Sequence, residues 1–248
     1  MEAIVLAGGF GTRLRQVVPD RPKPMALVGG RPFLEILLGS LARKGFERVV
    51  LSLGYMADKI VAHFGDHFAG MEIAYVVEDS PLGTGGAVRL AMSKCVADHV
   101  FVFNGDTFLD LEVNAVERHW QQYHRTIMVG FKVPDTARYG RLLTEQNRVI
   151  GFVEKGIAGP GLINAGCYVF SSKQLDSFAL ITAFSLETDY LATLVSQSPV
   201  DLFVTNGQFI DIGIPEDLLR AQTEVLSGRG KLFEYSFPRH QAEDRSLS

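Results

Sequence analysis

A short segment near the start of the chain gathers the residue types that bind phosphate. It reads LAGGFGTRLRQVVPDRPKPM and spans residues 6–25, in a chain whose formal net charge is −4. Guanidinium and ammonium groups neutralise phosphate oxygens, and glycines let backbone amides approach an anion closely. Prolines on both sides of Lys23 are expected to hold it in an extended, stiff stretch. The segment therefore predicts a polyphosphate clamp, with an arginine-rich surface turn as the alternative. Its cations are Arg13, Arg15, Arg21 and Lys23.

The two common phosphate-binding motifs do not fit this segment. A P-loop needs Gly-Lys-Ser/Thr at a fixed distance after its first glycine, and neither Gly8 nor Gly9 is followed by it. The dinucleotide-binding motif G-x-G-x-x-G could begin at Gly9 and Gly11, but Leu14 stands where its third glycine belongs. The expected clamp is therefore of another kind.

Two aspartates follow apolar runs and could bind a metal ion. Asp106 ends the run HVFVFNGD, and Asp211 comes directly after QFI. Ligands of open α/β sheets bind at the carboxyl ends of strands, and Mg²⁺ prefers hard carboxylate oxygens together with substrate phosphates. We expect both aspartates to bind Mg²⁺. The alternative is that each caps the helix or turn that follows it.

The elements that must position these residues alternate between strand and helix through the first half of the chain. Short apolar runs indicate strands, and apolar residues at helical spacing indicate helices. This alternation is typical of β-α-β units, in which helices cover a parallel sheet. The expected strands are 3–7, 48–54, 72–77 and 99–106, and the expected helices are 31–45, 58–68 and 86–95.

Strands dominate the second half of the chain until its last part. The run 140–155 is expected to form a hairpin around Gln146 and Asn147, because asparagine tolerates the positive φ of a tight turn. Helical spacing returns at 187–197 and at 215–228, with a pair of strands between them near 200–213. The other expected strands are 126–133 and 162–171.

Composition narrows the class of protein. The chain has 248 residues, of which 47% are hydrophobic and 21% charged, an ordinary composition for a globular protein. Its negative charge argues against a protein that coats nucleic acid or an anionic membrane. Cys95 and Cys167 fit two buried thiols rather than a zinc or redox pair. No signal peptide or membrane span is recognisable, so we expect a cytoplasmic protein. The sequence leaves monomer and homo-oligomer both open.

Several segments together resemble the signature of the sugar-1-phosphate nucleotidyltransferases, also called nucleotide-sugar pyrophosphorylases. LAGGFGTRL followed by RPKPM carries the resemblance most specifically. Further segments agree with the family in order and spacing, so that the resemblance covers nearly all of residues 1–228. They are EDSPLGTGGA (78–87), NGD (104–106), YG (139–140), EK (154–155), NAG (164–166) and DIGIPED (211–217).

The resemblance implies a Rossmann-like three-layer α/β/α fold, the nucleotide-diphospho-sugar transferase fold, with a mixed, mostly parallel central sheet. Residues 1–228 would form a single domain. Its first half, 1–110, would bind the nucleotide, and its second half, 111–228, would bind the sugar phosphate. The polar C-terminal extension 229–248 is expected to be partly disordered.

The family transfers a nucleoside monophosphate from a nucleoside triphosphate to a sugar 1-phosphate, with Mg²⁺ and no covalent protein intermediate. By resemblance, the catalytic residues are Arg13, Lys23, Asp106, Lys155 and Asp211, of which Asp106 and Asp211 bind the metal. The nucleotide would contact Leu6, Ala7, Gly8, Gly9, Gly11, Thr12, Arg13, Lys23, Glu78, Gly83 and Thr84. The sugar phosphate would contact Asn104, Tyr139, Gly140, Glu154, Lys155 and Asn164.

The base is expected to be guanine if Glu78 faces its edge, as the resemblance implies. A carboxylate only accepts hydrogen bonds, and guanine presents N1–H and N2–H₂ side by side. Uracil and thymine present one N–H between two carbonyls, which a carboxylate would repel. The alternative is that Glu78 caps the nearby turn. The expected substrate is therefore GTP.

The sugar is indicated only by the resemblance, which is greatest to the guanylyltransferases that act on D-glycero-α-D-manno-heptose 1-phosphate and supply GDP-heptose for capsule or surface-layer glycans. The compact chain lacks the C-terminal extension common among mannose-1-phosphate guanylyltransferases. Alternatives are such a mannose enzyme, a uridylyltransferase for a hexose or N-acetylmuramate 1-phosphate, and a catalytically silent regulatory subunit. The charged positions Arg13, Lys23, Asp106, Lys155 and Asp211 are all present, which favours an active enzyme.

Overall fold

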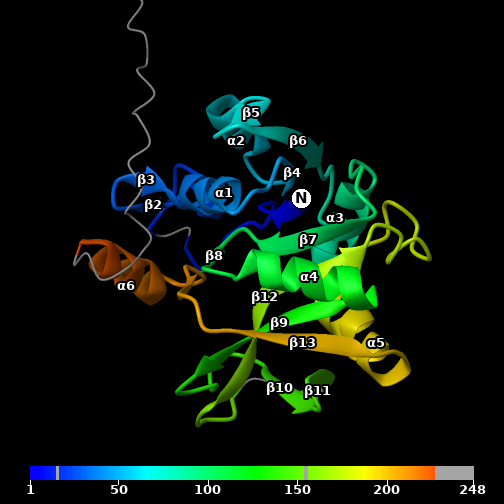
Figure 1. Cartoon of the computed structure of the whole chain (residues 1–248). Helices are drawn as coiled ribbons and strands as arrows, with labels where there is room; N and C mark the ends of the chain where they lie inside the picture. The colour runs from blue at the N-terminus through cyan, green and yellow to red at the C-terminus, as the bar shows by residue number, and fades with distance from the viewer. Residues whose placement is uncertain (15–16, 154–155, 227–248) are drawn as a thin grey trace, which may run out of the picture.

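A ten-stranded mixed sheet forms the centre of the molecule. The structure is a computed structural model that describes residues 1–14, 17–153 and 156–226. Strands in the described sheet follow the order β10-β11-β13-β9-β12-β7-β1-β4-β6-β5. Figure 1 shows helices on both faces of this sheet, which gives the three expected layers. The expected extension 229–248 lies outside the described residues.

The first half of the chain builds a parallel block at one end of the sheet. β1 pairs in parallel with β4 and with β7, and β4 pairs in parallel with β6. Both faces of these strands are covered, which is why they read as continuous apolar runs rather than as alternating ones. The strands of this block are β1 (Glu2–Leu6), β4 (Arg48–Leu53), β6 (Met71–Val77) and β7 (His99–Asn104), with the short β5 (His67–Phe68) antiparallel to β6.

The second half adds strands of both directions. β12 is antiparallel to β7 and to β9, while β13 is parallel to β9 and antiparallel to β11. β1, β4, β6, β7, β9, β10 and β13 therefore run in one direction, as a mostly parallel sheet requires. Gln146 (φ 48°) and Asn147 (φ 61°) form the turn between β10 and β11, so the expected hairpin is confirmed. These strands are β9 (Ile127–Val133), β10 (Arg141–Glu145), β11 (Arg148–Val153), β12 (Gly161–Ser171) and β13 (Val200–Thr205).

One pairing differs from the expectation. The run near 200–213 contains two strands, but β13 and β14 (Phe209–Asp211) do not pair with each other. Both edges of β13 are already occupied, by β9 and by β11. β14 instead pairs with β8 (Thr107–Leu109), directly after Asp106. This pairing brings two distant segments of the chain together at the end of β7.

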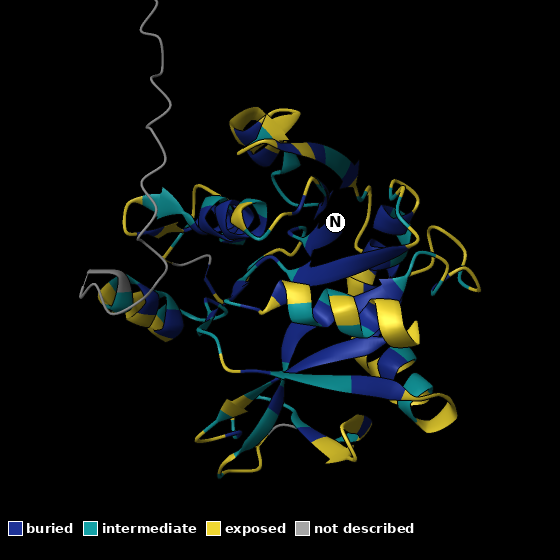
Figure 2. Ribbon diagram, in the orientation of Figure 1, coloured by how far each residue is buried: buried dark blue, intermediate teal, exposed yellow. Residues whose placement is uncertain are grey.

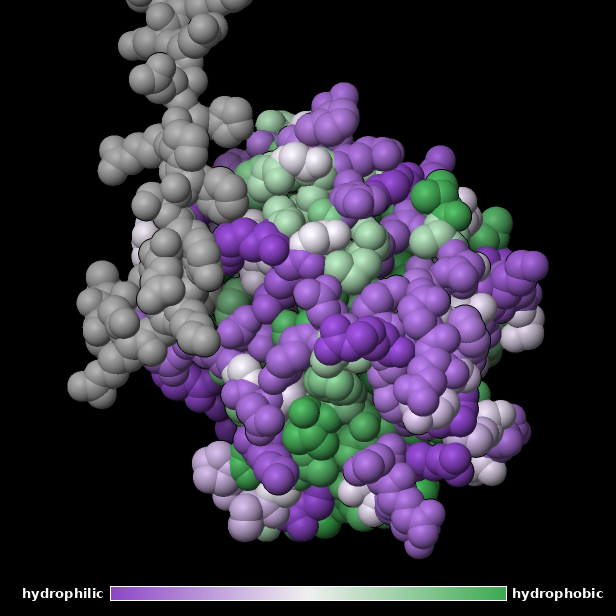
Figure 3. All heavy atoms as spheres, viewed as in Figure 1, coloured by the Kyte–Doolittle hydropathy of each residue, from purple (hydrophilic) through white to green (hydrophobic). Residues whose placement is uncertain are grey.

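Helices of the two outer layers cover separate apolar cores. α1 (Phe33–Arg43), α2 (Ala57–Phe64) and α4 (Val113–Tyr123) pack on one face, and α3 (Gly83–Met92), the π-helical turn η2 (Leu186–Leu191) and α5 (Ala192–Gln197) pack on the other. Figure 2 shows the strands buried between these layers, and Figure 3 shows mostly hydrophilic side chains over the outer face of α4. α6 (Pro215–Leu226) packs with a smaller core beside β2 (Leu27–Val28) and β3 (Arg31–Pro32).

Three local features depart from the expectations. α4 was not expected, because only Val113, Val116 and Trp120 are buried in an otherwise polar stretch, a narrow apolar stripe. α3 begins at Gly83 rather than at residue 86, because its early glycines weaken the helical pattern. Lys23 begins a 3₁₀ turn, η1 (Lys23–Met25), instead of lying in an extended stretch. Proline needs no amide donor in a first helical turn, so Pro24 fits there.

Among the described residues, no helix is long and apolar enough to cross a membrane.

Candidate active site

Glycines bring the loop after β1 into close contact with its neighbours. A Cβ atom added to Gly8 would lie 3.0 Å from the amide nitrogen of Gly54, and one added to Gly54 would lie 2.7 Å from the Gly8 carbonyl oxygen. Gly11 has a φ of +57°, and a Cβ there would lie 2.8 Å from Cβ of Lys23. Side chains at these positions would clash, so the glycines are needed for the loop to pack against the end of β4 and against η1.

Lys23 and Asp106 meet at the end of β7. The Lys23 ammonium donates a hydrogen bond to Oδ2 of Asp106, and the pair is partly buried. β1 and β7 are parallel neighbours, so the loops that follow them leave the sheet at the same edge. A strand-end carboxylate and the cation of the glycine-rich segment therefore face each other.

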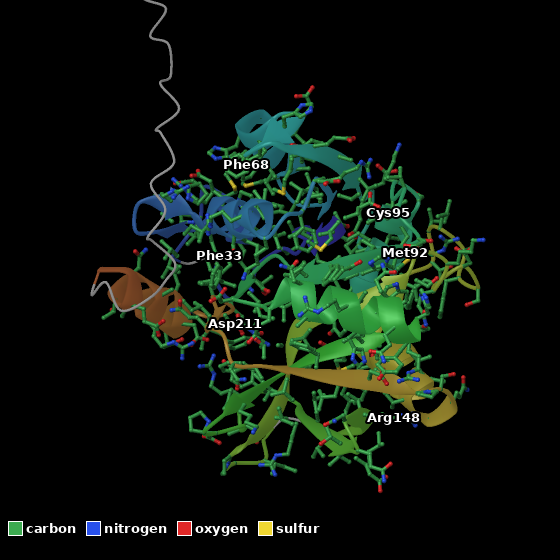
Figure 4. All side chains as sticks on the ribbon, viewed as in Figure 1. Phe33, Phe68, Met92, Cys95, Arg148 and Asp211 are labelled. Carbon is green, nitrogen blue, oxygen red and sulfur yellow. The ribbon has the colours of Figure 1, made fainter. Side chains whose placement is uncertain are left out.

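Asp211 joins this pair from the other half of the chain. It lies opposite Thr107 in the β14–β8 ladder, and the Ile212 amide donates to the carbonyl oxygen of Asp106 at 2.9 Å. Burial and the nearby charge of Asp106 raise the pKa of Asp211, while Lys23 lowers it. Figure 4 shows Asp211 between α6 and the sheet. Two mutually repelling carboxylates held together this way are a donor set that fits a divalent cation.

An open cavity of about 540 Å³ extends from this charged group along the glycine-rich loop. Its wall combines loops that follow β1, β4, β6 and β7, which are neighbours in the parallel block. The volume suits a small organic ligand. The lining residues are Leu6, Ala7, Gly8, Gly9, Phe10, Gly11, Lys23, Pro24, Ser52, Gly54, Tyr55, Glu78, Asp79, Ser80, Pro81, Gly83, Thr84, Ala87, Asn104 and Asp106.

Glu78 both caps a turn and faces this cavity. Its Oε2 accepts a hydrogen bond from the Leu82 amide at 2.8 Å, and its Oε1 lies 3.4 Å from where a Cβ of Gly8 would be. Each carboxylate oxygen has two acceptor positions, so the cap leaves capacity for a ligand. Burial raises the pKa of Glu78, and the hydrogen bond from Leu82 opposes this shift. The two roles considered for Glu78 therefore do not exclude each other.

The start of α3 packs tightly against residues 182–186. Gly83 has a φ of +68°, and a Cβ there would lie 2.5 Å from the carbonyl oxygen of Phe184. The Gly85 amide donates to that same oxygen at 3.0 Å, and the Leu186 amide donates to Oγ1 of Thr84 at 2.9 Å. The glycines of LGTGGA are thus required for packing on this segment as well as for lining the cavity.

Asn104 connects the cavity to a bulge in β12. The register of β12 against β9 shifts between Asn164 and Tyr168. Gly166 lies in this bulge with a φ of +69°, and a Cβ there would lie 2.5 Å from Nδ2 of Asn104. Nδ2 of Asn164 donates to the Tyr168 hydroxyl at 2.6 Å, and Oδ1 of Asn164 accepts from the Gly166 amide at 3.1 Å.

Tyr139 lies on the Asp211 side of the site. Its ring packs edge-on against Phe209 with centroids 6.1 Å apart. Burial raises the pKa of Tyr139, and the charge of Asp211 adds to the shift. The preceding Arg138 forms a bidentate ion pair with Asp217 at the start of α6, and Asp217 is only 2% exposed. Gly140, the second residue of the YG segment, directly precedes β10.

The structure brings most of the expected residues to one edge of the sheet, with some exceptions. Thr12 and Arg13 are exposed and do not line the cavity. Glu154 and Lys155 lie outside the described residues. The expected residues in the cavity wall are Leu6, Ala7, Gly8, Gly9, Gly11, Lys23, Glu78, Gly83, Thr84, Asn104 and Asp106.

The loop after β4 also contributes to the wall, although it was not among the expected site residues. Gly54 and Tyr55 of this loop line the cavity together with Ser52 of β4, and the rings of Phe10 and Tyr55 lie 5.7 Å apart. The signal was present, because strand 48–54 was expected beside the first strand and parallel strands deliver their following loops to the same edge. Arg138 and Asp217 were not singled out either.

Comparisons with known proteins find relatives that match nearly the whole described chain. The nucleotidyl transferase family matches residues 2–228. D-glycero-α-D-manno-heptose 1-phosphate guanylyltransferase of Aneurinibacillus thermoaerophilus is 38% identical over 226 residues, which cover 91% of this chain and 98% of that protein. The crystal structure of HddC from Yersinia pseudotuberculosis complexed with GMP-PN superposes with a TM-score of 0.81 at 37% identity, over 90% of this chain and 99% of that one. Mannose-1-phosphate guanylyltransferase of Mycobacterium tuberculosis is 35% identical over 234 residues, which cover 92% of this chain and 65% of that protein.

Proposed function

Because the chain belongs to the nucleotidyl transferase family, we propose that it transfers the guanylyl group of GTP to D-glycero-α-D-manno-heptose 1-phosphate. The chain is a nucleotidyltransferase by its family and by relatives that match nearly its whole length. One structural observation carries the proposal: Lys23, Asp106 and Asp211 converge beside a glycine-lined cavity that also contains Glu78.

The reaction is an in-line displacement at the α-phosphorus of GTP. A phosphate oxygen of the sugar 1-phosphate forms a new bond to this phosphorus, and the bond from the phosphorus to the oxygen bridging it to the β-phosphorus breaks. GDP-sugar and pyrophosphate are the products. Both reactants are anions, so the protein must hold them in contact and neutralise charge on the leaving group.

The glycine-rich loop and Lys23 supply the nucleotide side of this arrangement. Gly8, Gly9 and Gly11 let backbone amides approach the triphosphate, as their position in the cavity wall supports. The Lys23 ammonium then stabilises charge that develops on the departing pyrophosphate. Arg13 is proposed to close over the triphosphate from its exposed position. Lys155, by resemblance, would neutralise the incoming sugar phosphate.

Asp106 and Asp211 would hold a divalent cation, which we propose to be Mg²⁺. A bound Mg²⁺ supplies positive charge that draws the two phosphate groups together and stabilises the leaving oxygen. Asp211 is kept in place by the hydrogen bond from the Gly213 amide, at 2.6 Å from its Oδ1. Asp106 is held by the backbone bond from Ile212 to its carbonyl oxygen. These contacts let the protein orient both carboxylates before substrates arrive.

Glu78 would select guanine by accepting hydrogen bonds from N1–H and N2–H₂. Its fixed side chain and its place in the cavity wall support this role. The nucleotide-binding half would be residues 1–110 and the sugar-binding half 111–228, with Asn104, Tyr139, Gly140, Glu154 and Asn164 on the sugar side. We further propose that the enzyme works in the cytoplasm and that its product is used for capsule polysaccharide.

A second candidate substrate is mannose 1-phosphate, because a relative of that name is 35% identical to the chain. Purified protein should be assayed for pyrophosphate release with Mg²⁺ against GTP, UTP, dTTP and ATP, each with heptose, mannose, glucose and N-acetylmuramate 1-phosphates. The proposal predicts the highest kcat/KM for GTP with the heptose. A higher value with mannose selects the second candidate, a preference for UTP selects a uridylyltransferase, and no turnover in any combination indicates a silent subunit.

A further inference from the structure

Glu187 lies on the π-helical turn η2, next to Leu186, whose amide is bonded to the cavity-lining Thr84. Single π-helical turns are rare and occur frequently at functional sites. Two contacts fix the position of this turn. The Leu186 amide donates to Oγ1 of Thr84, which lines the cavity, and Nδ2 of Asn164 donates to Oε1 of Glu187 at 3.3 Å. Glu187 is thus held between Thr84 in the cavity wall and the bulge of β12.

The other acidic residue of this turn has a structural task that Glu187 does not share. Ser185 Oγ accepts a hydrogen bond from the Thr188 amide, and the Asp189 carboxylate accepts one from the Ser185 amide at 2.7 Å. This reciprocal arrangement satisfies the free amides at the start of the turn. Glu187 is exposed, and its Oε2 has no hydrogen-bond partner within residues 1–14, 17–153 and 156–226. Its second oxygen is therefore available to a ligand.

Asn164, which was expected to bind the sugar, is engaged by the protein at both ends of its amide. Oδ1 accepts from the Gly166 amide, and Nδ2 donates to the Tyr168 hydroxyl and to Glu187. The Tyr168 hydroxyl also lies 3.5 Å from Oε1 of Glu187. Burial keeps the pKa of Tyr168 well above its ordinary value, so the phenol keeps its proton. Both Asn164 and Tyr168 therefore orient the Glu187 carboxylate.

We propose that Glu187 binds hydroxyl groups of the sugar in the sugar 1-phosphate, and that Asn164 and Tyr168 are positioning residues for it. A carboxylate only accepts hydrogen bonds and repels phosphate, so its partner is the uncharged, hydroxyl-bearing part of a substrate. Two neighbouring hydroxyls of a sugar can donate to the two oxygens of one carboxylate. This inference rests on the proposed function, because it assigns the substrate of that same site.

The test compares wild type, Glu187→Ala and Glu187→Gln with the control Glu145→Gln, which removes an exposed carboxylate at the end of β10. The steady-state KM for the sugar 1-phosphate should rise about 10-fold or more in Glu187→Ala and less in Glu187→Gln, because a hydrogen bond to a charged group is stronger than one to a neutral group. The KM for GTP, the thermal unfolding midpoint and the kinetics of the control should stay at wild-type values.

Deoxy analogues of the preferred sugar 1-phosphate give a readout that a purely structural role would not produce. For the analogue that lacks every hydroxyl bound by Glu187, wild type and Glu187→Ala should have equal kcat/KM, whereas they should differ for the parent sugar. If Glu187→Ala lowers kcat/KM by the same factor for the parent sugar and for every analogue, the proposal is overturned. An unchanged KM for the sugar 1-phosphate also overturns it. A rise in the KM for GTP alone also overturns it, because the carboxylate then binds the ribose. If wild type uses no sugar 1-phosphate, both the proposed function and this inference fail.

Discussion

Lys23 and Asp106 form an ion pair across 83 positions of sequence, at the point where the loop after β1 meets the end of β7. The lysine that we expect to bind phosphate is therefore paired with a carboxylate that we expect to bind the metal. The charge of Lys23 also acts on Asp211. Burial and the charge of Asp106 raise the pKa of the Asp211 carboxyl, and the positive charge of Lys23 reduces this rise. In the protein without substrates, the ammonium supplies the positive charge that the two carboxylates need.

Replacing Lys23 with alanine should strengthen the binding of a divalent cation to the protein without nucleotide. The change removes a cation that competes for Asp106, so the dissociation constant for Mn²⁺, measured by electron paramagnetic resonance, should fall about 5-fold or more. Lys44→Ala is the matched control, because it breaks a lysine–aspartate pair with Asp110 at 2.7 Å outside the cavity wall. Weaker or unchanged Mn²⁺ binding in Lys23→Ala would show that Lys23 does not compete with the cation.

Asp106→Asn and Asp211→Asn should each lower kcat about 100-fold or more at saturating Mg²⁺, because an amide is a much weaker ligand for a hard cation than a carboxylate. Initial rates of pyrophosphate release measure this. Asp110→Asn, a similar change four residues after Asp106, should retain activity within a few-fold of wild type. A near-normal rate for either site variant would remove that aspartate from the metal site.

Glu78→Gln should reduce the preference for GTP over other triphosphates and should change its pH dependence. Burial raises the pKa of Glu78 above the ordinary 4.5, and only the ionised carboxylate can accept two hydrogen bonds from guanine. In wild type, kcat/KM for GTP should therefore fall as the pH decreases through this raised pKa. The variant should lack that step, since glutamine does not titrate. An unchanged GTP preference and pH profile would mean that the base is recognised by other groups.

Arg138 and Asp217 should stabilise the joint between the Tyr139 loop and α6. Asp217 is buried, and hydrogen bonds with it raise the pKa of Arg138. Among the described residues, Arg138→Ala leaves the carboxylate with only the longer contact to Arg220 at 3.4 Å, so the free energy of unfolding should drop by about 3 kcal/mol. Urea denaturation measures this. Arg220→Ala is the control and should cost about 1 kcal/mol or less, because its contact with Asp217 is longer and its loss leaves the bidentate pair with Arg138 in place. Equal losses in both variants would contradict the assignment.

Residue patterns predicted the parallel block and the strand-end positions because continuous apolar runs report burial on both faces. The run that ends at Asp106 also placed this aspartate at a strand end, whereas Lys23 and Glu78 were named as site residues by the resemblance. The partner of β14 could not be predicted, because it depends on which edges of β13 other strands already occupy. The sequence also did not indicate that the early glycines of α3 are needed for packing, because this need arises from a contact with Phe184 about a hundred residues away.

Partners within the site were the least predictable part. Nothing in the local sequence around Asn164 indicates that Tyr168 and Glu187 engage its amide. The same holds for Arg138 and Asp217, which are 79 positions apart. Such pairs arise from packing of distant segments, so a motif can name a functional residue while leaving the groups that orient it unknown.

Guanylyl transfer is the central claim, and the fate of the α-phosphate of GTP tests it most directly. GTP labelled at the α-phosphate should be incubated with the enzyme, Mg²⁺ and D-glycero-α-D-manno-heptose 1-phosphate. We expect all consumed label to appear in GDP-heptose, with one pyrophosphate released for each molecule formed. Label appearing in GDP or GMP with no nucleotide sugar, or no consumption of GTP with this sugar phosphate, would contradict it.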